Sequence, residues 1–335
     1  MQFITDGPDI PDELLQAHEE GRVVFFCGAG ISYPAGLQGF KWLVEKIYEG
    51  VGTVRNGIEE AAFKRGQFDV TLNLLEQSLP GGSIAVRREL EKVLKPKLRR
   101  KGATATHAAL LKLARSREDA LRLVTTNFDC LFREAAKRTK TKQKFQTHTA
   151  PMLPIPQNKL WDGLVYLHGW LPKKPSDMNL KELVLTSADF GKAYLTEGWA
   201  ARFVSELFRN YSVCFVGYSI NDPVMRYMMD ALARTHSEPT HHVYAMGGYP
   251  PEKEEEARIE WKAKGVIPIL YEDKDYHSLL HETLKEWAKI YSRGVQGKVG
   301  IVKELACKMS SGSTKQDDSR DTPRVSSVPR LACCP

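Results

Sequence analysis

The run VVFFC at residues 23–27, followed directly by GAGIS at residues 28–32, decides the class of fold. Its first half is β-branched or aromatic and stops at a glycine, which is the pattern of a buried strand. Apolar side chains then recur at helical spacing, at Phe40, Leu43, Val44, Ile47 and Tyr48. A strand, a glycine loop and a helix open a doubly wound α/β fold, so we expect that fold here.

Strand-like and helix-like runs alternate along most of the remaining sequence. Further strands are expected at residues 121–126, 164–167, 183–185, 213–216, 243–246 and 266–270. The later helices are expected at residues 187–210, 223–233, 251–264 and 276–291. This alternation predicts a mainly parallel, Rossmann-like sheet with helices on both faces.

Two segments depart from the alternation. Residues 52–118 contain several consecutive helix-like runs, so we expect a helical insertion within a single domain of residues 1–300. Residues 301–335 are rich in Ser, Thr, Asp, Arg and Pro and poor in large apolar side chains. Because such a composition does not build a core, we expect a disordered tail there.

The composition is that of an ordinary soluble protein. The 335 residues are 42% apolar with a formal net charge of +7, and no apolar run approaches the ~20 residues that span a bilayer. The first twenty residues are acidic and do not resemble a secretion signal. Of six cysteines, Cys27, Cys130 and Cys214 are spaced too widely for a metal knuckle. We therefore expect a protein of the reducing cytoplasm, without a membrane anchor.

Two basic stretches carry part of the positive charge, at Lys92–Lys101 and Arg133–Lys144. They fit a nucleic acid or an acidic protein as partner, and they equally fit solvated helix faces and loops. Neither stretch contains the interleaved aromatic residues of a base-stacking surface, which favours the solvated interpretation.

Polar residues directly follow four of the expected strands. Gly28-Ala29-Gly30-Ile31-Ser32 follows the first strand, and Asn127-Phe128-Asp129 follows the second. His168-Gly169 and Gly217-Tyr218-Ser219-Ile220-Asn221-Asp222 follow two later strands. Because ligands of an open parallel sheet bind outside the carboxyl ends of its strands, we expect one crevice lined by these four groups.

The first loop alone is a weak signal for a nucleotide site. Gly28 and Gly30 would let a pyrophosphate approach the backbone, with the N–H groups of the next helix pointing at it. The dehydrogenase fingerprint needs a small residue where Tyr33 stands, and a Gly-x-x-x-x-Gly-Lys-Ser/Thr phosphate loop is absent from the sequence. Hydride transfer and nucleotide hydrolysis are therefore disfavoured.

Each of these residues also has a purely structural interpretation. The glycines would suit a tight turn between a strand and a helix. Asn127 and Asp222 would suit helix N-caps, the latter because Pro223 is a favoured first helical residue. His168, after a buried strand, would suit a structural histidine. The occurrence of all four groups in one sequence is what favours a ligand site.

Taken together and in this order, the four groups resemble the nicotinamide-dependent core of the sirtuins, over residues 21–291. The matching motifs are Gly28-Ala29-Gly30-Ile31-Ser32, Thr125-Thr126-Asn127-Phe128-Asp129, His168-Gly169 and Gly217-Tyr218-Ser219. Protein deacylases of that family carry a four-cysteine zinc module, but Cys214 is the only cysteine between His168 and Lys303. Deacylases also have Pro-Asp-Phe-Arg where this chain has Gln38-Gly39-Phe40-Lys41. The pattern is similar to the zinc-less, sirtuin-like NAD hydrolases of bacterial antiviral defence.

This resemblance implies that NAD is the substrate, that no zinc is bound, and that the products are nicotinamide and ADP-ribose. Asn127 would orient the ribose or the attacking water, and His168 would act as general base. Asp129 would lie on the nicotinamide side of the pocket. Ser32 and the glycine amides would hold the phosphates, and Ser219 and Asp222 would lie on the adenosine side. The other cofactor-binding residues would be Gly28, Ala29, Gly30 and Gly217.

The resemblance further implies an effector that depletes NAD in infected cells and is activated by homo-oligomerisation or by a partner protein. The partners it suggests are a hexameric DNA-translocase-type ATPase and an Argonaute-like protein. Three other functions remain open: an NAD-dependent protein deacylase, a catalytically silent NAD- or ADP-ribose-sensing module, and a nucleic-acid-binding protein. The missing zinc cysteines disfavour the first, and the presence of both Asn127 and His168 disfavours the second.

Overall fold

The computed structural model describes residues 1–138, 145–157, 161–220, 222, 225, 227–228 and 241–294. Residues 1–289 form one compact unit, to which the sheet and its helices belong. The expected helix at 223–233 lies mostly outside the described residues, and the expected tail at 301–335 lies wholly outside them.

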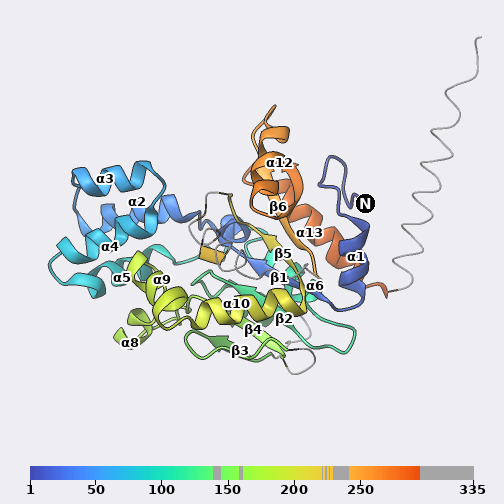
Figure 1. The fold of residues 1–335 in the computed structure, drawn as a ribbon, viewed down its shortest axis with the longest axis horizontal. Coiled ribbons are helices and arrows are strands. Elements are labelled where there is room, and N and C mark those ends of the chain that lie inside the picture. The colour runs from blue at the N-terminus through green and yellow to red at the C-terminus, as the bar shows by residue number, and fades with distance from the viewer. Residues whose placement is uncertain are drawn as a thin grey trace, which may run out of the picture. The chain divides into compact units, whose positions relative to one another are not determined.

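Seven parallel strands make up the sheet in the described part of the chain, in the order β3-β4-β2-β1-β5-β6-β7 (Figure 1). β1 (Val23–Cys27) and its neighbour β5 (Ser212–Val216) are buried along their whole length. The other strands are β2 (Arg122–Thr125), β3 (Thr147–Thr149), β4 (Gly163–Tyr166), β6 (Val243–Tyr249) and β7 (Ile267–Glu272). The strand order reverses at β1, and this reversal creates a crevice outside the carboxyl ends of the central strands. The predicted α/β fold with a parallel sheet is confirmed.

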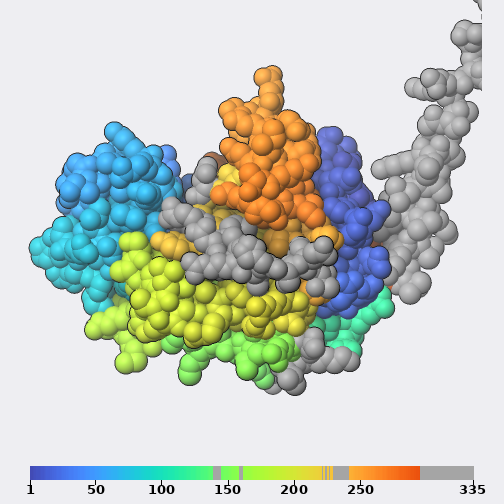
Figure 2. All heavy atoms as spheres, in the orientation of Figure 1, coloured from blue at the N-terminus to red at the C-terminus, as the bar shows by residue number. Residues whose placement is uncertain are grey.

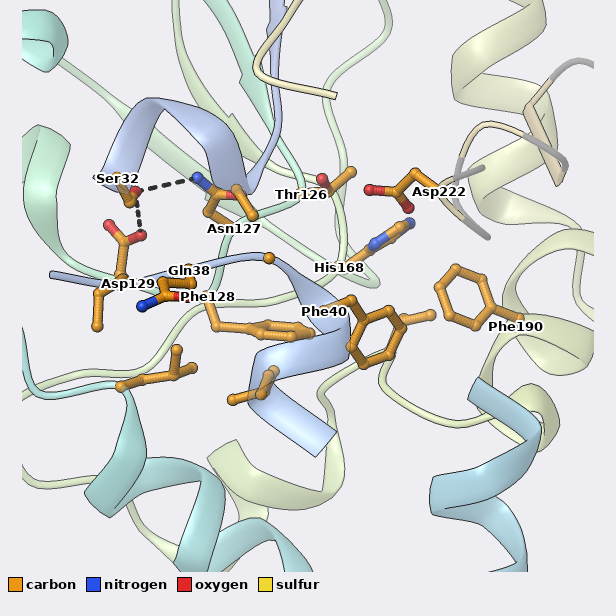
Figure 3. Close-up of a pocket in the computed structure, with 16 residues that line it drawn as sticks. Ser32, Gln38, Phe40, Thr126, Asn127, Phe128, Asp129, His168, Phe190 and Asp222 are labelled. Atoms are coloured by element: carbon orange, nitrogen blue, oxygen red, sulfur yellow. Dashed lines mark hydrogen bonds between the residues drawn. The ribbon is translucent and has the colours of Figure 1, made fainter. Parts of the chain in front are cut away.

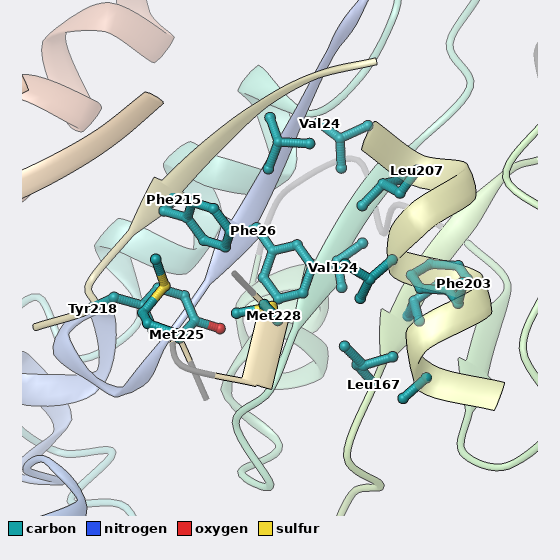
Figure 4. Packing of buried hydrophobic residues seen from close by; sticks show 14 of the residues in the cluster. Val24, Phe26, Val124, Leu167, Phe203, Leu207, Phe215, Tyr218, Met225 and Met228 are labelled. Atoms are coloured by element: carbon teal, nitrogen blue, oxygen red, sulfur yellow. The ribbon is translucent and has the colours of Figure 1, made fainter. Parts of the chain in front are cut away.

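One face of the sheet is covered by α10 (Trp199–Asn210) and α12 (Glu254–Ala263). Successive side chains of a strand point to opposite faces, so Val24 and Phe26 of β1 lie together on this side. Figure 4 shows both packed with Phe203 and Leu207 of α10 and with Phe215 of β5. This apolar layer fixes the central strands from which the polar loops emerge.

The opposite face is covered by α1 (Asp12–Glu19) and α13 (Ser278–Tyr291). Phe25 of β1 points to this face, where its ring centroid lies 5.7 Å from that of His18 and 5.6 Å from that of Trp287. The backbone carbonyl of Leu113, at the end of α6 (Ala105–Leu113), lies 2.7 Å from His18 Nε2. Within the described residues, no helix combines the length and the apolar character needed to cross a bilayer.

A helical lobe beside the sheet has a core of its own (Figures 1 and 2). It contains α2 (Phe40–Val51), α3 (Gly57–Lys64), α4 (Phe68–Ser78), α5 (Gly82–Val93) and α8 (Asp177–Lys181). Its core is made of Leu43, Val44, Ile47, Tyr48, Phe63, Leu72, Leu75, Val86, Leu90, Leu171, Leu180, Leu183 and Leu185. The lobe is therefore not identical with the expected insertion of residues 52–118, because it also includes α2, which precedes that segment, and α8, which follows it. The last helix of that segment, α6, packs instead on α7 (Leu131–Arg138).

Two expected elements differ in the structure. Residues 183–185, expected as a strand, form an irregular segment, because the carbonyl of Leu183 accepts a hydrogen bond from Arg87 rather than from a neighbouring strand. The expected helix at 187–210 is divided into α9 (Ser187–Gly191), a π-helical turn η3 (Lys192–Thr196) and α10. Gly198 has a φ of +63°, a left-handed conformation that separates the last two.

Candidate active site

One pocket opens at the carboxyl ends of β1, β2, β4 and β5, where the strand order reverses. Its sheet side is lined by residues that follow the strands: Ala29, Ser32, Thr126, Asn127, Phe128, Asp129, His168 and Asp222. The opposite side is mainly apolar and is called the lobe side because Phe40, Leu43 and Leu94 pack in the core of the lobe. Its other residues are Leu37, Gln38, Gly39, Val184 and Phe190, of which the last two pack in the core of the sheet. Figure 3 shows the polar groups facing a layer of aromatic rings. All four groups that the sequence places at strand ends contribute to this pocket.

A hydrogen-bonded cluster of three side chains forms one end of the pocket (Figure 3). Ser32, in the 3-10 helix η1 (Ala29–Ala35), donates its hydroxyl proton to Asp129 Oδ2 at 2.9 Å. Asn127 Nδ2 donates to the carbonyl oxygen of Gly28 at 3.0 Å and to Ser32 Oγ at 3.4 Å. The loops after β1 and β2 therefore hold these three side chains in fixed orientations.

Asp129 serves both the pocket and the following helix. Its side chain is 6% exposed, and burial raises the pKa of the carboxyl group, although hydrogen bonds from Leu131 and Ser32 oppose that shift. Oδ1 accepts the backbone N–H of Leu131, the first residue of α7, at 2.9 Å. Asp129 thus caps α7, a role that the sequence left open for Asn127, whose side chain points to the loop after β1.

His168 follows β4 and is almost completely buried, with 1% of its surface exposed. Its Nε2 lies 2.9 Å from the hydroxyl oxygen of Tyr194, and its ring packs edge-on against Phe190 with centroids 5.1 Å apart. Burial lowers the pKa of the imidazole from 6.5 to about 3. His168 is therefore neutral at physiological pH. It is able to accept a proton, but it is a weaker base than a histidine with a pKa near neutrality.

Gly28, Gly30 and Gly217 pack the loops after β1 and β5 against each other. The N–H of Gly30 donates to the Gly217 carbonyl at 2.8 Å, and that of Gly28 to the Val216 carbonyl at 2.9 Å. A Cβ on Gly30 would lie 2.9 Å from Gly217 Cα, and one on Gly217, whose φ is +75°, 2.7 Å from Ile31 N. None of these three glycines is among the described residues that line the pocket. Two of the amides expected at a phosphate are thus engaged within the protein.

The two remaining predicted residues lie on the loop after β5. The carbonyl of Ser219 accepts the N–H of Asp222 at 3.1 Å, and Ser219 itself is exposed and is not part of the described lining. Asp222 lines the pocket, and Figure 3 shows its carboxylate on the side of Thr126 and His168. Its negative charge adds to the effect of burial in raising the pKa of Tyr194. Asp222 therefore places negative charge near Tyr194, the hydrogen-bond partner of His168.

Several residues of the pocket gave no signal in the sequence. Phe40 and Phe190 lie in helices, where an apolar residue at helical spacing indicates a core position. Thr126 lies within the predicted motif, which assigns it no role. Its Oγ1 is 2.6 Å from the hydroxyl oxygen of Tyr218, which donates to the Cys27 carbonyl at 3.2 Å.

The described residues contain no group of three or more His, Cys, Asp or Glu side chains placed to hold a metal ion. Cys27 and Cys214 are buried in neighbouring strands, and burial raises the pKa of both thiols. Cys130, beside Asp129, is half-buried, and burial raises its pKa as well. The expectation that the protein binds no zinc stays a prediction.

Residues 121–269 match the model of a family described as the SIR2-like domain. The chain contains a SIR2-like domain. The matched segment begins beside β2 and ends within β7, so it carries Asn127, Asp129, His168 and Asp222. SIR2-like domains are in general NAD-dependent enzymes, and the activity indicated for this domain is therefore NAD-related.

A curated relative extends this similarity over more of the chain. The uncharacterized protein y4cA of Sinorhizobium fredii (strain NBRC 101917 / NGR234) is 34% identical over 274 residues, which are 79% of this chain. The same match covers 22% of the relative, so the chain spans about a fifth of the length of the curated relative that it matches. Most of the relative's length therefore lies outside the match.

Proposed function

We propose that this SIR2-like domain hydrolyses NAD+ at the bond between nicotinamide and ribose, giving nicotinamide and ADP-ribose. One observation carries the proposal: Asn127, Asp129 and His168, all within the matched segment, line one pocket where a parallel sheet reverses its strand order. That position is where open α/β sheets bind their ligands.

The reaction sets definite demands on the pocket. The bond between the anomeric carbon of the ribose and the nicotinamide nitrogen breaks, and its electron pair leaves with neutral nicotinamide. A water oxygen bonds to the same carbon, and the water loses one proton. The leaving group needs no proton because it departs from a cation. The chain must therefore position the ribose and the water, and must accept that proton.

The sheet side of the pocket supplies these functions. The Asn127 amide, held by Gly28 and Ser32, orients the ribose or the water. Neutral His168 accepts the proton, and Tyr194, whose hydroxyl oxygen lies 2.9 Å from His168 Nε2, holds the ring in place. Asp129 lies on the nicotinamide side.

We assign the remaining predicted residues to the phosphates and the adenosine of NAD+. We assign the phosphate end to Ala29 and Ser32, which line the pocket. Gly28 and Gly30 shape the loop that carries them, since their N–H groups donate to the carbonyls of Val216, at the end of β5, and Gly217. The adenosine end is assigned to the loop of Gly217 and Ser219, which is joined to the β1 loop by these same hydrogen bonds.

The proposal includes activation by oligomerisation or by a partner protein. The pocket encloses about 80 Å³, whereas ligand pockets commonly enclose roughly 300–1,000 Å³. A whole dinucleotide needs more room than this volume, so we propose that activation moves the lobe side outward. The unmatched length of y4cA is consistent with further protein acting beside a domain of this kind.

The biological role we propose is depletion of NAD in antiviral defence. It rests on the resemblance to sirtuin-like NAD hydrolases. A hexameric DNA-translocase-type ATPase or an Argonaute-like protein would supply the trigger. Loss of protection against phage in a bacterial host that expresses Asn127→Ala in place of the wild-type chain would support this role, and equal protection by both chains would contradict it.

The hydrolase proposal is tested by incubating the purified chain with NAD+ and measuring nicotinamide and ADP-ribose. We expect the two products in equal amounts, and a fall on the order of 100-fold or more in Asn127→Ala. Asn210→Ala is the matched control, because Asn210 caps the end of α10 through the Glu206 carbonyl and does not line the pocket. Equal turnover in the wild type and in Asn127→Ala would contradict the assignment.

One observation favours a second function, a module that senses NAD or ADP-ribose without turnover. His168 is buried and already bonded to Tyr194, which restricts its access to water. A sensing module would be stabilised against heat by ADP-ribose and would release no nicotinamide. The same samples decide between the two functions if thermal unfolding is recorded beside product release.

A further inference from the structure

A second pocket adjoins the candidate active site along η1. Ala29 and Ser32 of this segment line the first pocket, Tyr33 and Pro34 line the second, and Gln38 lines both. The second pocket has a volume of about 640 Å³, which falls within the roughly 300–1,000 Å³ of small-molecule sites. Its other walls come from α2, from the loop before α6 and from the start of α13.

Positive charge dominates this second pocket. Four cationic side chains line it, from three separate parts of the chain: Lys46, Lys97, Arg100 and Lys285. Lys46 pairs with Glu49 at 2.5 Å, whereas the other three form no ion pair with any carboxylate in the described residues. The acidic residues of the lining are Asp275 and Glu282, so cations outnumber anions there. His281 adds no charge at neutral pH, because burial lowers its pKa to about 4.

Two of these cations are held in place by the end of η1. The backbone N–H of Lys97 donates to the Ala35 carbonyl at 2.8 Å. Gly36 has a φ of +80°, and a Cβ there would lie 3.1 Å from both Arg100 Nη1 and Lys97 Cδ. The absence of a side chain at this position lets both cations pass over the loop. The basic stretch Lys92–Lys101 thus contributes to a concave site rather than only to a solvated surface.

The stretch Lys92–Lys101 contains no aromatic residue, but aromatic side chains from other parts of the chain line the second pocket. Trp42 of α2 and Tyr276, before α13, both line it. Tyr276 is 76% exposed, so its ring is open to contact with a ligand. Tyr33 also lines the pocket but is already stacked on His277, with centroids 5.1 Å apart. Cations beside open aromatic faces match the phosphates and the base of a nucleotide.

We propose that this pocket is a second ligand site, which binds a small nucleotide carrying a diphosphate group. Lys97, Arg100 and Lys285 bind the phosphates, and Tyr276 stacks on the base. The proposal does not depend on NAD hydrolysis, because none of these four residues lines the candidate active site. A small ligand is favoured over a nucleic acid strand because the cations surround a concavity that also contains Asp275 and Glu282.

Calorimetric titration of the full chain with inorganic pyrophosphate and with ADP tests the proposal. We expect one site per chain for each probe, with weaker binding at higher salt because Lys97 and Arg100 are exposed. Lys97→Ser/Arg100→Ser should weaken both probes by about tenfold or more. Tyr276→Ser should weaken ADP by about threefold and leave pyrophosphate unchanged.

Two control variants establish that binding occurs in this pocket. Lys262→Ser/Lys264→Ser removes the same charge from α12 and the residue after it, and should bind both probes as the wild type does. Ser219→Ala should also leave binding unchanged, because Ser219 belongs to the adenosine end that we assign to the candidate active site, so a loss of affinity in this variant would place ADP there. The proposal is overturned if neither probe binds, if either control loses as much affinity as Lys97→Ser/Arg100→Ser, or if duplex DNA binds more tightly than ADP with the same dependence on Lys97 and Arg100.

Discussion

The two sides of the candidate active site are built in different ways. The sheet side consists of short loops that directly follow buried strands, and its polar atoms are fixed by hydrogen bonds such as Ser32 to Asp129 and Asn127 to Gly28. The lobe side is apolar, and part of it belongs to a separate helical core. The hydrogen-bonded polar groups therefore lie on the sheet side, while apolar side chains, partly from the lobe, line the opposite side.

Arg87 of α5 connects the lobe to the segment that closes the pocket. The side chain is 3% exposed and forms ion pairs with Glu76 at 2.9 Å and Asp189 at 2.6 Å. Its guanidinium also donates to the backbone carbonyls of Leu180, Lys181 and Leu183. This segment continues to Val184, whose N–H donates to the carbonyl of His168 at 2.9 Å. One buried cation thus holds the lobe side against the sheet side.

Replacing Arg87 should have the largest effect on stability. Arg87→Met leaves Glu76 and Asp189 as unpaired carboxylates in a buried site, so we expect a loss of about 3–5 kcal/mol in the free energy of unfolding. Urea denaturation measures this loss. Arg88→Met is the matched control, because Arg88 is 40% exposed and its ion pairs with Glu91 and Asp177 are at the surface. A control loss above about 1 kcal/mol would show that burial is not the cause.

Disrupting the backbone contact between the loops after β1 and β5 should have the second-largest effect on stability. Gly217→Ala introduces a Cβ 2.7 Å from Ile31 N at a φ of +75°. We expect a loss of about 3 kcal/mol in the free energy of unfolding, of which about 1 kcal/mol comes from the left-handed conformation alone. Gly265→Ala isolates that part, because Gly265 has a φ of +72° and open space around its Cβ. Equal losses in the two variants would mean that the loop contact is not tight.

The lobe side should affect binding more than chemistry. Phe40 lines the pocket and packs edge-on against Phe68 with ring centroids 6.0 Å apart. We expect Phe40→Leu to raise the KM for NAD+ by about tenfold, which is about 1.4 kcal/mol, with kcat changed by less than about threefold. Steady-state kinetics measure both constants. Phe208→Leu, on α10 beside Phe215, is the control and should leave both constants as they are. A fall in kcat at constant KM would contradict a purely shaping role.

The free energy of unfolding should fall gradually as the pH falls, because His168 is buried in its neutral form. The folded state holds the pKa of His168 at about 3, below the 6.5 of an unperturbed imidazole, so the unfolded state binds the extra proton between these values. The contribution of His168 to stability is therefore complete above pH 6.5 and is lost as the pH falls toward 3. We expect His168→Gln to reduce the slope of stability against pH by up to about 1.4 kcal/mol per pH unit in this range. An unchanged slope in His168→Gln would show that the imidazole is hydrated in the folded state.

The sheet was predictable because its determinants are local. β1 and its glycine loop were visible as a β-branched and aromatic run that ends at Gly28, and the alternation of strands and helices fixed the parallel topology. The segment at 183–185 has the composition of a strand, but a tertiary contact from Arg87 takes the carbonyl that a strand would use. β3 is three residues long and partly exposed, which is too short for a periodic signal.

The polar half of the pocket was predictable for the same reason, and the rest was not. Asn127, Asp129 and His168 follow strands directly, so sequence position alone places them at one edge of the sheet. Phe40 reaches the pocket through the packing of the lobe and Phe190 through the core on one face of the sheet, and no local pattern encodes either arrangement. The pKa of His168 also depends on burial under residues far along the chain, so its lowered value was not expected.

Whether this pocket cleaves NAD+ is tested by comparing nicotinamide release in His168→Gln and His18→Gln with release by the wild type. Both histidines are buried, and burial lowers the pKa of both, to about 3 for His168 and about 4 for His18. His18 lies on the opposite face of the sheet, between Phe25 and Trp287. We expect release to fall on the order of 100-fold or more in His168→Gln and to stay at the wild-type rate in folded His18→Gln. Equal rates in the two variants would contradict the assignment of this pocket as the site of NAD+ cleavage.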